Sequence, residues 1–303
     1  MIHLTGLTNA MTDIIVDASD VEIREMGLKK GFYNPKADFD YQRFLEFVAA
    51  KGKMECPGGS PFNVVCNLSR LGLNTVLLGT VGDDKRGHDY IEYAKARRIG
   101  SLVSKAAGSS GICYLMATPD GEKTSVVVRG VMGEYNYDLS EVRQTRFFHT
   151  SGYEYMTNTE KTEETLDYMK KLCAVVSFDI GDPEVVRKRR QGLEKVIEKS
   201  DVLFITEKEA AELVGNSYPE KELSGMCRTV VLKKGSDGSV VMRGNENYFI
   251  PPFNGRVVNT IGAGDAFAAG FLFGEIRNYG LQECGYLGSY IASLVCRKAG
   301  AHL

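Results

Sequence analysis

Short apolar runs rich in β-branched residues alternate with amphipathic segments of helical period along most of the chain. The strand-like runs are Thr75–Val81, Phe147–Thr150, Ala174–Asp179, Val202–Thr206 and Thr229–Lys233. The helical segments are Phe62–Leu71, Lys161–Leu172, Val185–Glu198, Ala263–Tyr279 and Leu281–Lys298. A parallel sheet needs such crossover helices, because consecutive strands that run the same way cannot be joined by a tight turn. The alternation therefore predicts an α/β fold with a mostly parallel central sheet and helices on both faces.

Two further segments predict β-hairpins. Gly238–Arg243 and Tyr248–Pro251 flank a short polar connection, whereas Ile112–Thr118 and Thr124–Arg129 flank a Pro-Asp-Gly turn. Asp13–Val16 predicts another short strand near the beginning of the chain. Strands that interrupt a βαβ pattern often form a small second layer over a site.

Nothing in the sequence divides the chain into separate domains. It contains no linker rich in Pro, Gly or Ser, no low-complexity segment and no internal repeat. We therefore expect one domain over residues 1–303, with a small β lid drawn from roughly residues 10–35 and 108–132, where the predicted strands depart from the alternation.

Charge and composition exclude several classes of function. A formal net charge of −2 over 303 residues leaves no basic surface for nucleic acid. No apolar run approaches the roughly 20 residues that a membrane helix needs, and the first residues do not resemble a signal peptide. The seven cysteines include no Cys-x-x-Cys pair, which indicates reduced thiols. We expect a cytoplasmic protein that binds neither nucleic acid nor membranes.

The segment Val257–Phe271 places the sequence Gly-Ala-Gly-Asp at the start of a small, apolar helix. The first amides of a helix have no internal partner and attract anions, and Gly262 and Gly264 would let a phosphate reach them. Asp265 would repel that phosphate unless it had a role of its own. A general base that deprotonates an attacking hydroxyl must stand beside the phosphoryl group, and Asp265 meets this requirement. The simpler alternative is a glycine turn with Asp265 as a helix cap.

A second glycine pair precedes another predicted helix. Gly58 and Gly59 permit close approach of a ligand to the backbone, and the Asn63 amide both donates and accepts hydrogen bonds. Asn9 and Asp13 flank the end of the first strand, where an amide and a carboxylate could hold adjacent sugar hydroxyls. Taken alone, these residues are equally compatible with an ordinary capped helix and a strand-end turn.

Together, these motifs resemble the PfkB-type carbohydrate kinases of the ribokinase-like fold, a family that also contains adenosine kinase. The matching segments are Gly58-Gly59-Ser60-Pro61-Phe62-Asn63, Val81-Gly82-Asp83-Asp84, Asp120-Gly121-Glu122-Lys123, Lys234-Gly235-Ser236-Asp237-Gly238 and Asn259-Thr260-Ile261-Gly262-Ala263-Gly264-Asp265. They keep the family's order over nearly the whole chain, and residues 20–56 resemble the adenosine-kinase branch. The resemblance implies a three-layer α/β fold with a β lid, and transfer of the γ-phosphoryl group of ATP to a hydroxyl, usually a primary one.

The resemblance also implies roles for particular residues. Asp265 is the expected base, and the amides of Gly262, Ala263 and Gly264 are expected to form the anion hole. The expected acceptor-binding residues are Asn9, Asp13, Gly58, Gly59 and Asn63, and the expected ATP-binding residues are Lys123, Thr206, Lys234, Gly235 and Gly238. Relatives use Mg²⁺ on the nucleotide phosphates, with Glu209 in position to order it indirectly. Many also hold a monovalent cation such as K⁺ near the anion hole, and pair as homodimers through the lid.

Three departures from the family pattern matter. Asn259 stands where the family usually has Asp, which puts the nearby cation site in doubt. Thr206 replaces the amide of the usual Asn-x-x-Glu, although Glu209 keeps its place. The chain also lacks Gly-x-x-x-x-Gly-Lys-Ser/Thr, so it is not a P-loop enzyme.

The acceptor is not fixed by the sequence. A sugar is the expected substrate and a nucleoside the alternative, for which Phe32, Tyr33, Tyr114 and Tyr153 are candidate contacts to a base. A sensor that binds sugar or nucleotide without catalysis is disfavoured, because Asp265 and both glycine motifs are retained. A dinucleotide-dependent oxidoreductase is disfavoured, because Gly-x-Gly-x-x-Gly is missing after the first strand.

Overall fold

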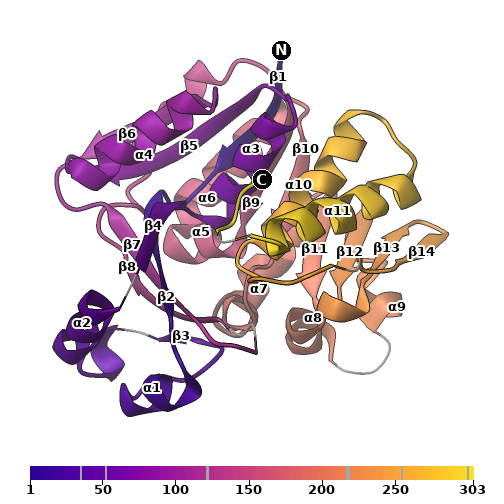
Figure 1. The fold of residues 1–303 in the computed structure, drawn as a ribbon. Helices are drawn as coiled ribbons and strands as arrows, with labels where there is room; N and C mark the ends of the chain where they lie inside the picture. Colours follow the sequence, from indigo (N-terminus) through magenta and orange to yellow (C-terminus); the bar gives the residue numbers. More distant parts are fainter. Residues whose placement is uncertain (35, 52, 121–122, 216–218, 254, 299) are drawn as a thin grey trace.

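A computed structural model describes residues 1–34, 36–51, 53–120, 123–215, 219–253, 255–298 and 300–303. Within these residues, nine strands form one sheet in the order β14-β13-β12-β11-β10-β9-β1-β5-β6 (Figure 1). The strands are β1 (Ile2–Leu7), β5 (Thr75–Gly82), β6 (Gly100–Ala106), β9 (Thr145–Ser151), β10 (Val175–Asp179), β11 (Val202–Thr206), β12 (Thr229–Lys233), β13 (Ser239–Arg243) and β14 (Glu246–Ile250). Only the pairs β12–β13 and β13–β14 of this sheet are antiparallel. The predicted parallel sheet and its C-terminal hairpin are therefore confirmed.

The central strands are buried on both faces, which explains their nearly continuous apolar sequences. In β11, Val202 and Phe204 pack into one core, whereas Leu203 and Ile205 pack into the other. The first core is covered by α3 (Ser60–Arg70), α4 (Lys85–Ala96), α10 (Ala263–Ile276) and α11 (Leu281–Cys296). The second is covered by α5 (Gly152–Thr157), α6 (Thr159–Lys171), α7 (Pro183–Lys199), α8 (Glu207–Val214) and α9 (Pro219–Leu223). The result is the predicted arrangement of three layers.

A second sheet lies beside the first and has its own apolar core (Figure 1). Its order is β3 (Tyr33–Asn34), β8 (Lys123–Val128), β7 (Gly111–Ala117), β2 (Met11–Asp17) and β4 (Lys53–Gly58). The helices α1 (Asp20–Glu25) and α2 (Tyr41–Ala50) contribute Ile23, Phe44 and Val48 to this core. The β7–β8 hairpin is confirmed. Strand β4 also joins this sheet, although it lies outside the two segments from which we expected a lid.

Helices α10 and α11 approach each other closely because glycines line their contact. A Cβ atom on Gly270 would lie 2.5 Å from the carbonyl oxygen of Leu287, and one on Gly288 would lie 2.8 Å from the ring of Phe267. No larger residue fits at either position without moving a helix. This close packing fixes α10, and with it the helix N-terminus that carries Asp265. None of the helices in the described ranges is long and apolar enough to cross a membrane.

Candidate active site

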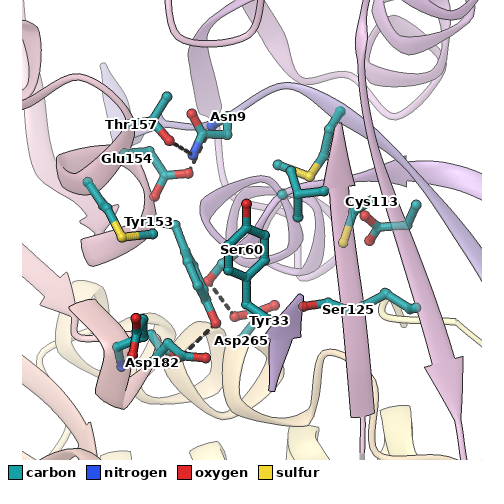
Figure 2. A pocket seen from close by; sticks show the side chains of 18 of the residues that line it. Asn9, Tyr33, Ser60, Cys113, Ser125, Tyr153, Glu154, Thr157, Asp182 and Asp265 are labelled. Atoms are coloured by element: carbon teal, nitrogen blue, oxygen red, sulfur yellow. Dashed lines mark hydrogen bonds between the residues drawn. The ribbon is translucent and has the colours of Figure 1, made fainter. Parts of the chain in front are cut away.

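A cavity of about 530 Å³ opens at the carboxyl ends of the parallel strands (Figure 2). Asn9 follows β1, Glu154 follows β9, and Thr206 and Glu209 stand at the junction of β11 and α8; all four line the cavity. The carboxyl edge is where open α/β sheets usually bind ligands, because the loops after parallel strands converge there. The second sheet forms the opposite wall through β2, β3, β7 and β8.

Asp265 lies in the first turn of α10 and lines this cavity. Its carboxylate accepts hydrogen bonds from the Ser60 hydroxyl and from the Asn63 side-chain amide, each at 2.7 Å (Figure 2 shows Ser60 beside it). Both donors belong to the first turn of α3, so two helix N-termini meet at one carboxylate. This contact explains why the second glycine motif precedes α3, and it ties the acceptor side of the cavity to α10.

The N-terminus of α10 has no side-chain cap. Gly262 occupies the cap position with φ of 72°, and a Cβ atom there would lie 2.4 Å from that of Ala301, so both backbone conformation and space demand glycine. The Ala263 amide donates to the Thr260 carbonyl oxygen at 3.1 Å and is therefore engaged in this structure. Gly264 follows in the first turn. This end of α10 has the positive potential that suits an anion.

The acceptor-side residues are buried and held in place. The side chain of Asn9 donates to the Thr157 hydroxyl at 3.1 Å and accepts from the Tyr135 hydroxyl at 2.6 Å, while its backbone amide donates to Glu154 at 2.9 Å. Asp13, on β2, is 6% exposed and lines the same cavity. Its presence beside β4 explains Gly58, where a Cβ atom would lie 2.1 Å from the Asp13 carboxyl group.

Gly59 and Asn63 complete this part of the cavity. Gly59 has φ of 110°, and a Cβ atom there would lie 2.4 Å from the Thr8 hydroxyl. The side-chain oxygen of Asn63 lies 2.8 Å from the imidazole Nε2 of His302. Burial lowers the pKa of His302 to about 4, so this imidazole is neutral at neutral pH. Because the Asn63 amide donates to Asp265, its oxygen is left to accept from His302, which fixes the orientation of the amide.

Of the residues expected to bind ATP, and of Glu209, which is expected to order Mg²⁺, only some line the cavity. Thr206 and Glu209 line the cavity and form a capping box at the start of α8. Lys234, Gly235 and Gly238 lie in the turn between β12 and β13, outside the cavity lining, and the Lys234 ammonium contacts Glu220 at 2.9 Å and Glu207 at 3.5 Å. The side chain of Lys123 lies outside the described residues. Of the expected anion-hole residues, Gly262 lines the cavity, whereas Ala263 and Gly264 are not among the lining residues.

Two carboxyl groups in the cavity are almost completely buried. Burial raises the pKa of Glu154 to about 7, although Ser151 and the Asn9 amide donate hydrogen bonds that favour its charged form. Burial likewise raises the pKa of Glu209 to about 7, against the opposing charge of Lys233. Burial thus favours the neutral form of each carboxyl group more than exposure to water would.

Several cavity residues were not identified from the sequence. Among them are the polar residues Ser60, Arg129, Glu154, Thr157, Asp182 and Lys208. Glu154 had a detectable signal, because an acidic residue soon after an apolar strand marks the carboxyl edge of a sheet. Of the aromatic candidates, Phe32, Tyr33 and Tyr153 line the cavity. Tyr114 packs in the core of the second sheet instead, edge-on against Phe44.

Comparison with known proteins agrees with this geometry. Residues 41–303 match the family described as pfkB family carbohydrate kinase. The chain belongs to the PfkB family. Members of this family are phosphotransferases that act on an alcohol group, so this PfkB protein is a kinase of a sugar or a nucleoside.

Relatives of this PfkB kinase cover both substrate classes. An uncharacterized sugar kinase of Archaeoglobus fulgidus is 29% identical over 247 residues, which are 77% of this chain and 96% of that protein. An ATP-dependent ribose-1-phosphate kinase of Halopiger xanaduensis is 30% identical over 84% of this chain and 85% of its own. The adenosine kinase structure from Sinorhizobium meliloti superimposes with a TM-score of 0.92 at 24% identity, covering 100% of this chain and 96% of that one. This last match confirms the ribokinase-like fold.

The buried carboxyl group of Glu154 predicts a specific pH dependence of stability. Its pKa rises from 4.5 to about 7 on folding. Its contribution to stability is therefore fully present below pH 4.5 and is lost as pH rises through about 7, a loss on the order of 3 kcal/mol. Glu154→Gln keeps a neutral side chain and should gain stability relative to wild type over this interval.

Urea unfolding of both proteins at several pH values between 4.5 and 8 measures this effect. Glu164→Gln, at an exposed carboxylate of α6, is the control and should leave the pH dependence unchanged. If the unfolding free energies of wild type and Glu154→Gln differ by the same amount at every pH, the Glu154 carboxyl group does not titrate as described.

Proposed function

We propose that this PfkB kinase transfers the γ-phosphoryl group of ATP to a hydroxyl group, expected to be primary, of a sugar, with Asp265 as the general base. One observation carries the proposal: the Asp265 carboxylate and the uncapped N-terminus of α10 share a cavity with Asn9, Asp13 and Asn63. An anion site, a base and a set of hydroxyl ligands are the three components that this reaction needs.

The chemistry follows from these positions. An acceptor hydroxyl held by Asn9, Asp13 and Asn63 would lose its proton to Asp265 as its oxygen attacks the γ-phosphorus. The bond from phosphorus to the bridging oxygen of ADP breaks, and ADP leaves. The amides at the start of α10 would stabilise the negative charge of the transferring group. Most of the rate enhancement would come from positioning and from fixed dipoles, because phosphoryl transfer requires little covalent participation by protein.

Mg²⁺ would be held in this cavity through the nucleotide and water more than through protein side chains. The described residues contain no group of three metal-ligating side chains, and Mg²⁺ commonly binds through nucleotide phosphates, water and one or two carboxylates. Glu209 lines the cavity and is 3% exposed, so it suits an ordering role through water. Bound Mg²⁺ would neutralise charge on the phosphate oxygens.

A nucleoside is the second candidate acceptor, and one observation favours it. The wall contributed by the second sheet is largely apolar; it includes Met11, Phe32, Tyr33, Leu115 and Val127. A free sugar offers such a wall only the small C–H face of its ring, whereas a nucleoside offers the larger planar surface of its base. The polar residues on the opposite side suit the ribose of a nucleoside as well as a free sugar.

A monovalent cation does not fit at Asn259. The side-chain nitrogen of Asn259 donates to the Lys298 carbonyl oxygen at 2.5 Å, and its oxygen accepts from the Ile261 amide at 2.8 Å. The amide N–H thus meets a carbonyl oxygen directly. A carboxylate at this position would set two oxygens against each other and would need a cation between them. We propose that the Asn259 amide replaces K⁺ in holding this loop beside the anion hole.

Three broader expectations complete the proposal. The chain acts as one kinase domain in which the second sheet covers the acceptor as a lid. Copies of the chain pair through an edge of that sheet, where β3 and β4 are the outer strands. The enzyme works in the cytoplasm, where ATP and sugars are available.

Asp265→Asn should keep the fold and the ATP affinity while lowering turnover by about two or more orders of magnitude, because the base is lost. Steady-state kinetics and calorimetric titration with ATP measure the two quantities. Asp167→Asn, at a surface carboxylate paired with Lys199, is the control and should retain wild-type turnover. Near-normal turnover in Asp265→Asn would refute the proposal.

A screen of ADP release with ketohexoses, pentoses, aldonates and nucleosides should identify the acceptor. For a free sugar, Phe32→Ala should change kcat/KM by less than about threefold. For a nucleoside, it should lower kcat/KM by about tenfold or more, the scale of a lost aromatic contact. A nucleoside that proved the best substrate would replace the sugar assignment.

Asn259→Asp should convert a cation-independent enzyme into one that responds to K⁺. Wild type should have the same Tm and the same turnover in potassium chloride and in tetramethylammonium chloride. The variant should show a lower Tm in tetramethylammonium that K⁺ restores, because an ion must separate the two oxygens. A wild-type Tm or turnover that depends on K⁺ would contradict the proposed replacement.

A further inference from the structure

The buried ammonium group of Lys233 lies next to the first turn of α10. Lys233 ends strand β12, and its side chain is only 12% exposed. Its ammonium contacts the carboxylate of Asp179, the last residue of β10, at 2.6 Å, and that side chain is 6% exposed. Both residues therefore stand at the carboxyl edge of the sheet, although neither is among the residues that line the cavity.

Lys233 remains charged in this position. Burial acts to lower its pKa, but the carboxylates of Asp179 and Glu209 outweigh burial and raise it. The Phe204 ring, 5.9 Å from the ammonium, adds a weaker attraction. The ammonium also lies near the first turn of α10, whose positive end repels it, and the carboxylates of Asp179, Glu209 and Asp265 offset this repulsion. A negatively charged group bound between the ammonium and the helix N-terminus would be attracted by both.

Gly264 gives the ammonium access to that position. An ideal Cβ atom on Gly264 would lie 3.5 Å from the Lys233 nitrogen, and it would meet no other atom within 4 Å among the described residues. The glycine thus leaves a gap about the size of a methyl group between the ammonium and the first turn of α10. At Gly262 and Gly270, by contrast, a Cβ atom would collide with backbone atoms of neighbouring residues.

We propose that Lys233 binds the terminal phosphate of the nucleotide from behind α10, moving from Asp179 to a phosphate oxygen when ATP binds. The inference rests on the proposed kinase function and adds a residue to it. In the free enzyme, the Asp179 carboxylate binds the ammonium and compensates its positive charge. A charged donor in a water-poor site stabilises the developing charge of phosphoryl transfer more than a neutral amide does.

The neighbouring lysine is arranged differently. Lys234 turns towards α8 and α9, where its ammonium contacts Glu207 and Glu220. The resemblance to the family pointed to Lys234 as the lysine near ATP. Geometry points instead to Lys233 as the lysine that meets the terminal phosphate, because its ammonium alone of these two lies against the N-terminus of α10.

Two variants of the ion pair test the proposal because they are expected to act in opposite directions. Lys233→Met combined with Asp179→Asn removes both charges and avoids leaving an unpaired buried carboxylate. It should weaken ATP binding by about tenfold and ADP binding by less than about threefold, and lower kcat by about 100-fold. Asp179→Asn alone frees the ammonium, so it should bind ATP at least as tightly as wild type does. Calorimetric titration with ATP and with ADP gives the ratio of the two affinities.

Two further variants separate the proposal from its alternatives. Arg243→Met breaks a half-buried ion pair with Glu275 at the other end of α10; it should lower Tm without changing the ratio of ATP to ADP affinity. Lys234→Met tests the competing lysine. The proposal fails if the folded double variant keeps the wild-type ratio of ATP affinity to ADP affinity within about twofold. It also fails if Lys234→Met, and not the double variant, lowers this ratio. Loss of turnover in Asp265→Asn together with an unchanged ratio in the double variant would reject the role of Lys233 and leave the kinase function standing.

Discussion

The meeting of two helix N-termini at the Asp265 carboxylate is the interaction on which the site depends. Ser60 and Asn63 donate to this carboxylate from α3, and α10 presents the carboxylate from its own first turn. Each helix start requires glycine at its cap, because Gly59 and Gly262 have positive φ and no room for a side chain. The glycines thus allow the two helices to start side by side, and the carboxylate is oriented by donors from the neighbouring helix.

The rest of the fold keeps these helix ends in place. Helix α10 lies against α11 through Gly270, which meets the backbone of Leu287, and through Gly288, which meets the ring of Phe267, so the two helices pack closely. The parallel strands deliver Asn9, Glu154, Asp179 and Lys233 to the same edge, since the loops after such strands converge. A sheet that is buried on both faces has little freedom to shift, which suits a reaction that requires accurate alignment.

The sequence was sufficient for the fold because the relevant patterns are local. Strand and helix periods predicted most of the main sheet, both hairpins and helices on both faces, but not β6 at its edge. The glycine motifs pointed to Asp265 and Asn63. The details that escaped prediction depend on contacts between distant segments. His302 meets Asn63 across 239 positions of sequence, and β4 joins the second sheet through pairing with β2. Lys233 and Lys234 make different contacts because their side chains leave the end of β12 in different directions. Two adjacent lysines in a sequence do not show which direction each side chain takes.

Some predicted residues remain predictions. The Lys123 side chain lies outside the described residues, and the turn that contains Gly235 and Gly238 stands apart from the cavity lining. Glu154 was missed because its role arises from burial, which raises its pKa to about 7, and burial is a property of the folded chain. The position of Glu154 soon after an apolar strand was visible in the sequence, but its burial was not.

The two walls of the cavity belong to different sheets, and this division has an evolutionary consequence. Asp265 and the N-terminus of α10 belong to the main sheet and its helices, whereas Met11, Leu115 and Val127 come from the smaller sheet. Substitutions on the smaller sheet can reshape one wall of the cavity while the wall that carries Asp265 stays intact. In a lineage built on this plan, the two walls can therefore change separately.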